Sequence, residues 1–156
     1  MPESLQQNLK MQESLHNSDI ESYLKENGEI LIAPTGFSMW PLLKGDFCQV
    51  ILKQVTEPPE PYDVVLYRTT TGKLILHRVL EQQPDGYRIR GDNTYWDETG
   101  IMLTQILGVM SGFYRGDRFV SCESFVYRLY SRIWTWIYPA RRFLITLIRL
   151  LRRGKK

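Results

Sequence analysis

The sequence predicts a mainly β fold: a mostly antiparallel sheet with a short helix before it and amphipathic helices after it. Between Glu29 and Cys122, short runs rich in Val, Ile, Leu and Tyr alternate with Gly, Pro and Asp, which is typical of strands joined by tight turns. After Cys122 the apolar residues recur every three or four positions, as they do along a helix. With 156 residues, 43% of them hydrophobic, the chain is long enough to bury the core of one domain.

A short helix is expected in the N-terminal segment, residues 1–28. Ser18 or Asp19 is the candidate N-cap, and the pair Asn27-Gly28 is a typical helix end. The apolar residues of this helix fall on one face: Ile20, Tyr23 and Leu24.

Residues 29–122 are expected to form the β-rich domain. Its candidate strands, in chain order, are EILIA, FCQVILKQV, DVVLYRT, KLILHRVLE, GYRIRG and ILGVMSGFYRGDRFVSC. Turn residues separate these runs at 71–72, 84–86 and 115–117, and so predict hairpins. Pro58, Pro59 and Pro61 predict a loop, because proline cannot donate a hydrogen bond to a central strand.

Residues 123–156 are expected to form a basic tail of two amphipathic helices, separated near Pro139 because proline kinks or ends a helix. The apolar face of the first helix comprises Phe125, Leu129, Ile133 and Trp136. The second combines an apolar face of Phe143, Leu144, Leu147, Leu150 and Leu151 with an opposite face of Arg142, Arg149, Arg152 and Arg153.

The charge is divided unevenly along the chain. Residues 1–123 contain 11 Lys and Arg against 17 Asp and Glu, a net charge of −6, whereas residues 124–156 contain nine basic residues and no acid. Such a tail favours an anionic partner, and its interleaved aliphatic and aromatic residues, with Trp134, Trp136 and Tyr138 suited to the headgroup region, fit lipid better than nucleic acid. We therefore expect residues 125–156 to bind a membrane surface, peripherally and on the cytoplasmic face, and expect no nucleic-acid partner. Neither a signal peptide core nor an uncharged apolar run of membrane-spanning length is found.

Cys48 and Cys122 are too few for a disulfide framework, and no Cys or His cluster has zinc-site spacing. We expect neither a metal nor another cofactor. His16 and His77 are the only histidines, so imidazole chemistry has few candidates.

The stretch PTGFSMWPLLKGD places Ser38 among residues that constrain the backbone. A buried serine in an ordinary loop is one interpretation; a nucleophile is the other. A serine hydroxyl needs a base to take its proton at neutral pH, and the chain offers His77 within the candidate strand LILHRV.

Four motifs resemble those of the signal peptidase I family, in the order that the family has them. GFSMWPLLKGD resembles the box that carries the nucleophilic serine, and DVVLYR followed by LILHRV resembles the next box, in the variant with histidine in place of lysine. RIRGDNTYWDE resembles the R/K-G-D-N box, and ILGVM the strand that closes the catalytic core. Together they cover about Glu29 to Arg115.

This resemblance implies a coiled, partly barrel-like sheet of the signal peptidase type and a serine endopeptidase with Ser38 as nucleophile and His77 as base. An acid of the third box would orient the imidazole, and Asp92 and Asp97 together are favoured over Glu98. Lys73 is off the matching position, which makes a Ser-Lys pair the weaker interpretation.

The resemblance also implies an acyl-enzyme mechanism on a peptide or precursor-protein substrate that bears a leader or signal sequence. The backbone N–H of Ser38 is the first candidate for an oxyanion donor. Gly36 stands where lysine-type relatives can have a side-chain hydroxyl, so a second donor would be backbone or Thr35.

Two other functions compete with this one. A self-cleaving regulator related to the SOS-repressor peptidases would need a helix-turn-helix DNA-binding part, for which 28 residues are too few. A non-catalytic module that binds a membrane surface or a partner through the arginine-rich tail would not depend on Ser38.

Overall fold

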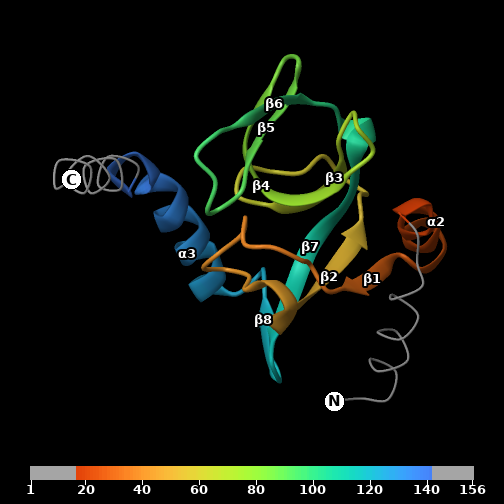
Figure 1. Cartoon of the computed structure of the whole chain (residues 1–156), viewed down its shortest axis with the longest axis horizontal. Helices are drawn as coiled ribbons and strands as arrows, with labels where there is room; N and C mark the ends of the chain where they lie inside the picture. Colours follow the sequence, from red (N-terminus) through yellow and green to blue (C-terminus); the bar gives the residue numbers. More distant parts are fainter. Residues whose placement is uncertain (1–16, 142–156) are drawn as a thin grey trace, which may run out of the picture.

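The fold is that of a computed structural model, which describes residues 17–141. It is mainly β, as the sequence predicts: eight strands form one antiparallel sheet, in the order β1-β2-β7-β3-β4-β5-β6, with β8 paired to β7 (Figure 1). This path does not close on itself, because β1 and β6 lie at its two ends. His16 and the second predicted tail helix, residues 142–156, lie outside the described residues.

The strands are β1 (Glu29–Ile32), β2 (Cys48–Gln54), β3 (Val64–Arg68), β4 (Leu74–Gln83), β5 (Gly86–Arg90), β6 (Glu98–Ile101), β7 (Ile106–Arg115) and β8 (Arg118–Ser121). The other elements with given bounds are the helices α2 (Asn17–Asn27) and α3 (Phe125–Trp136) and the 3₁₀ turns η1 (Gly45–Phe47) and η2 (Leu103–Gln105). Residues 138–141 are also helical, after a turn at Ile137. All six predicted strand regions and the three hairpins are confirmed, but β6 was not predicted.

Both helices differ in detail from the prediction. Ser18 and Asp19 lie within α2 (Asn17–Asn27), so neither is the residue before its first turn, as the prediction had it. α3 ends at Trp136, three residues before Pro139, and Ser124 caps its start by accepting a hydrogen bond from the backbone N–H of Tyr127. The break near Pro139 is therefore confirmed.

β3 lies at the centre of the sheet and is buried on both faces. Val64 and Leu66 pack into one apolar cluster with α2, β1, β2 and α3, while Val65 and Tyr67 pack into a second cluster with β5 and β6. Because side chains alternate along a strand, four consecutive apolar residues serve two cores.

The same alternation sorts the residues of β4. His77 pairs with Val65 and so faces the second cluster, whereas Arg78 pairs with Val64 and faces α3. Consecutive residues of one strand thus serve two sides of the sheet.

Candidate active site

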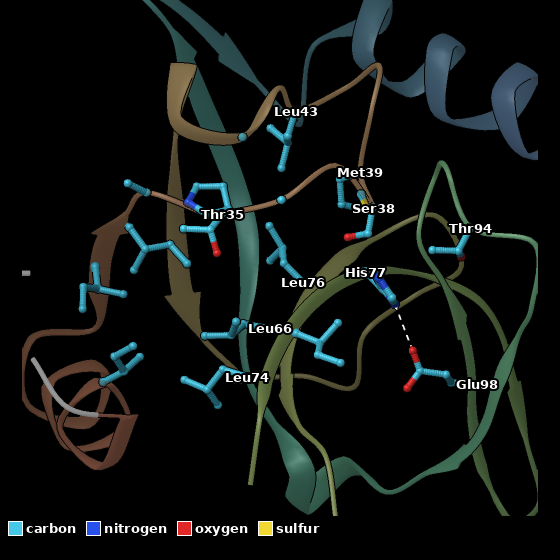
Figure 2. A pocket seen from close by; sticks show the side chains of 18 of the residues that line it. Thr35, Ser38, Met39, Leu43, Leu66, Leu74, Leu76, His77, Thr94 and Glu98 are labelled. Atoms are coloured by element: carbon cyan, nitrogen blue, oxygen red, sulfur yellow. Dashed lines mark ion pairs between the residues drawn. The ribbon is translucent and has the colours of Figure 1, made fainter. Parts of the chain in front are cut away.

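An apolar cleft with a volume of about 930 Å³ opens between β1, β3, β4 and the segment that carries Ser38. Figure 2 shows the Ser38 hydroxyl directed into this cleft near the imidazole of His77, with Glu98 on the opposite side of the ring. Much of the remaining lining is aliphatic: Ile20, Ile30, Ile32, Leu43, Leu66, Leu74, Ile75 and Leu76. The structure therefore brings the predicted nucleophile and base into one cavity.

The backbone before and after Ser38 is fixed by a neighbouring loop. The backbone N–H of Asn93 donates to the carbonyl of Ser38 over 2.7 Å, and the Asn93 side-chain amide donates to the carbonyl of Phe37 over 3.2 Å. Gly36 has a φ of 88°, a conformation that favours glycine. Gly36 therefore allows a backbone conformation that a residue with a side-chain hydroxyl would adopt only with strain.

Gly91 lies against both the Ser38 backbone and the imidazole of His77. A Cβ atom added to Gly91 would lie 2.7 Å from the backbone oxygen of Ser38 and 2.8 Å from Nε2 of His77. Nε2 therefore faces the same point as the Ser38 backbone. Among residues 17–141, no hydrogen bond is formed between Ser38 Oγ and His77. In enzymes without substrate, the hydrogen bond between nucleophile and base is often long and shortens when substrate binds.

The other imidazole nitrogen contacts Glu98. Oε1 of Glu98 lies 3.1 Å from Nδ1 of His77, and the Tyr67 hydroxyl lies 3.4 Å from the same nitrogen. His77 is 5% exposed, and burial lowers its pKa, although the nearby carboxylate of Glu98 acts in the opposite direction. The imidazole is thus neutral at neutral pH, with Nδ1 as the nitrogen that Glu98 orients.

Tyr67 is a site residue that the sequence reasoning missed. Its hydroxyl is buried between His77 and Glu98, and burial together with Glu98 raises the pKa of Tyr67. The register could have revealed it, because Tyr67 on β3 is the diagonal neighbour of His77 across the strand pair.

Asp92 and Asp97 have other partners. Asp92 binds the buried guanidinium of Arg78 through two hydrogen bonds of 2.8 and 2.7 Å, and Asp97 binds Arg88 and Arg90. The structure thus places Glu98, the less favoured of the three acids, beside the base. Lys73 is exposed on the turn between β3 and β4.

Arg78 connects the site to α3. Burial alone would lower its pKa, but Asp92 more than reverses this effect, so the pKa of Arg78 is raised and the guanidinium stays charged. It also donates to the carbonyl of Tyr62 and to the hydroxyl of Ser131 on α3.

Among residues 17–141, His, Cys, Asp and Glu side chains form no group of three or more that could hold a metal ion. The sequence matches no protein-family model, and no curated protein matches it. The likeness to signal peptidase I therefore stays a prediction from four motifs.

Proposed function

We propose that this protein is a serine endopeptidase that cleaves a leader- or signal-bearing precursor, with Ser38 as nucleophile and His77 as general base. The setting of His77 carries the proposal: Glu98 contacts Nδ1, while Nε2 faces Gly91 beside the Ser38 backbone. A Ser-His-acid triad has its acid on the Nδ1 side of the imidazole and its nucleophile on the Nε2 side, and this arrangement supports the proposal.

The chemistry follows from the tautomer that Glu98 favours. Its carboxylate accepts a hydrogen bond from the Nδ1–H of His77, so Nε2 keeps a lone pair and takes the proton of Ser38 as Oγ attacks the peptide carbonyl. The imidazolium then gives this proton to the leaving amine, which departs and leaves an acyl-enzyme. Water, deprotonated by Nε2, attacks the ester; the imidazolium returns that proton to Ser38 Oγ as the ester bond breaks and the second product leaves as the acid.

An oxyanion donor is available at the nucleophile itself. Within residues 17–141 no protein group accepts a hydrogen bond from the backbone N–H of Ser38, so this donor is free for the negative oxygen of the tetrahedral intermediate. Loss of one such donor typically lowers the rate by about 10²–10³.

A peptide substrate suits the walls of the cleft. β5 pairs with β4 only from Arg78 onward, so Leu74–His77 pairs with β3 alone, and β1 pairs with β2 alone among the described strands. Residues of both β1 and β4 line the cleft. An extended peptide between them can bind unpaired backbone groups and place apolar side chains against the aliphatic lining.

The test is labelling with a fluorophosphonate or lipopeptide-type acylating probe, with mass mapping of the adduct and a panel of leader-peptide substrates. We expect an adduct on Ser38 in the wild type and none in Ser38→Ala or His77→Ala. Folded wild-type protein that neither forms an adduct nor cuts any peptide, with lipid or detergent present, would overturn the proposal. An adduct that persists in His77→Ala would remove histidine as the base.

A further inference from the structure

α3 exposes its apolar side. Five large apolar side chains on this 12-residue helix are exposed, with these exposed fractions: Phe125 77%, Val126 75%, Leu129 46%, Ile133 48% and Trp136 84%. At 100° per residue they fall on one side of the helix, which we call the outward face of α3. In Figure 1 this helix lies along the flank of the sheet, so one side of it is free of the body.

The inward face of α3 is attached to the sheet by the buried ring of Tyr127, which packs into the first apolar cluster, and by polar contacts. Ser131 accepts a hydrogen bond from Arg78, and the indole N–H of Trp134 donates to the carbonyl of Asp92 over 3.1 Å. Just beyond the helix, Arg141 donates to the same carbonyl over 2.9 Å, and its guanidinium lies 3.7 Å from the ring centre of Trp134. Most of the large apolar side chains of α3 nevertheless lie on the outward face, which leaves an apolar surface for a partner to cover.

Charge indicates the chemistry of that partner. Arg128 and Arg132 are exposed and lie together along one border of the outward face, with Arg132 close to the ring of Tyr62. Residues 124–141 contain no acid, so this border is cationic. An apolar stripe bordered by arginines fits the headgroup and upper acyl region of an anionic bilayer.

The length of α3 limits how it meets lipid. Twelve residues span about 18 Å, less than the hydrocarbon thickness of a bilayer. Within residues 17–141 no helix is long and apolar enough to cross a membrane. The contact that remains is a helix lying parallel to the surface.

We propose that the outward face of α3 is a docking surface for an anionic lipid bilayer, on which the helix lies flat. Resting on the proposed function, this docking also orients the cleft. The inward face of α3 holds the carbonyl of Asp92, and the next residue, Asn93, holds the backbone of Ser38. The active site is therefore held at a fixed orientation to the membrane, and its substrate is a precursor that presents its cleavage site at the lipid surface.

The test uses full-length Ser38→Ala protein, so that its outcome does not depend on catalysis, and vesicles of phosphatidylcholine with or without phosphatidylglycerol. We expect binding to the anionic vesicles and a drop of about tenfold or more in partitioning for Leu129→Gln/Ile133→Gln, because two exposed aliphatic side chains that would enter the lipid are lost. Met102→Gln/Leu103→Gln, which changes exposed apolar residues on η2, is the matched control and should bind like the parent protein.

Trp136 reports directly on the helix. In a Trp40→Phe/Trp96→Phe background, brominated phosphatidylglycerol should quench the fluorescence of Trp136, and a further Trp136→Phe change should remove that quenching. Binding without quenching of Trp136 would overturn the proposal, since residues 142–156 would then bind alone. Failure to bind, or a lipid-free dimer that Leu129→Gln/Ile133→Gln dissociates, would also overturn it; the dimer would make this face a contact between two copies.

Discussion

Oε1 of Glu98 lies 3.1 Å from Nδ1 of His77, whereas Asp97, its neighbour in the sequence, binds arginines. Side chains on successive residues of an extended chain point to opposite sides, so only one of two adjacent acids can face the imidazole. Here β6 begins at Glu98, and its pairing with β5 places that carboxylate against the buried histidine.

Substitution of Glu98 should impair catalysis far more than substitution of Asp97. We expect Glu98→Gln to lower kcat/KM by about 10²–10⁴, because a neutral amide neither fixes the tautomer of His77 nor stabilises its charged form. Asp97→Asn leaves Nδ1 in contact with its partner and should retain activity within about tenfold. Steady-state kinetics on a cleaved leader peptide would decide between them, and a larger loss in Asp97→Asn would contradict our assignment.

The activity should decline on the acid side of neutrality. Burial lowers the pKa of His77 in the folded protein, so the acid limb of kcat/KM should have its midpoint below the ordinary histidine value of about 6.5. Because Glu98 acts against that shift, Glu98→Gln should move the midpoint further toward acid. A pH–rate profile of both proteins checks this prediction, and a midpoint above 7 in the wild type would contradict it.

The free energy of unfolding should also depend on the ionisation of His77, and it should decrease as the pH falls. Below the ordinary pKa the unfolded chain protonates its histidine more readily than the folded protein does, so the free energy of unfolding should fall as the pH falls through about 6.5. Replacement by glutamine, His77→Gln, should flatten this part of the curve. Urea unfolding at several pH values measures the slope, and an unchanged slope in the variant would rule out His77 as its source.

Loss of Asp92 should destabilise the protein through Arg78. Both side chains are almost fully buried, so Asp92→Asn leaves an uncompensated guanidinium and should cost about 3–5 kcal/mol in the free energy of unfolding. The double variant Arg78→Met/Asp92→Leu should be less destabilised than the single one, because no buried charge remains. Equal losses in the two variants, measured by denaturant titration, would argue against this account.

A methyl group at Gly91 should disable the site with a smaller effect on the rest of the fold. Its Cβ would lie under 3.0 Å from both the Ser38 backbone oxygen and Nε2 of His77, so one of the two must shift. We expect Gly91→Ala to lower kcat/KM by about 10²-fold or more, since a displacement of about 1 Å is that costly. Retained kcat/KM in a folded variant would mean that the two groups move together.

Most of the sheet could be predicted from the sequence, because apolar runs and turn residues locate seven strands and three hairpins. It missed β6, where Glu98–Ile101 contains a glycine at φ 71° and pairs irregularly with β5. A short, bulged edge strand has too little pattern to predict.

The candidate site was predictable where the chain carries its own chemical signature, at Ser38 and His77. Which acid meets the imidazole was not, because it depends on the register between β5 and β6. The tail was harder still: Trp134 and Tyr138 were expected at a membrane surface, but Trp134 bonds to Asp92 and the ring of Tyr138 lies against Arg90. Helical periodicity finds the two faces of a helix without saying which one a domain covers.

The carbonyl of Asp92 is held by Trp134 and Arg141, which lie more than forty residues later in the chain. During synthesis the chain emerges from its N-terminus, so the nucleophile, the base and the acid all leave the ribosome before the segment that braces their loop. A nascent chain halted before α3 would contain every catalytic group in an unsupported arrangement. If the protein is the protease proposed above, translation order would delay the onset of proteolysis until α3 and Arg141 have folded onto the sheet.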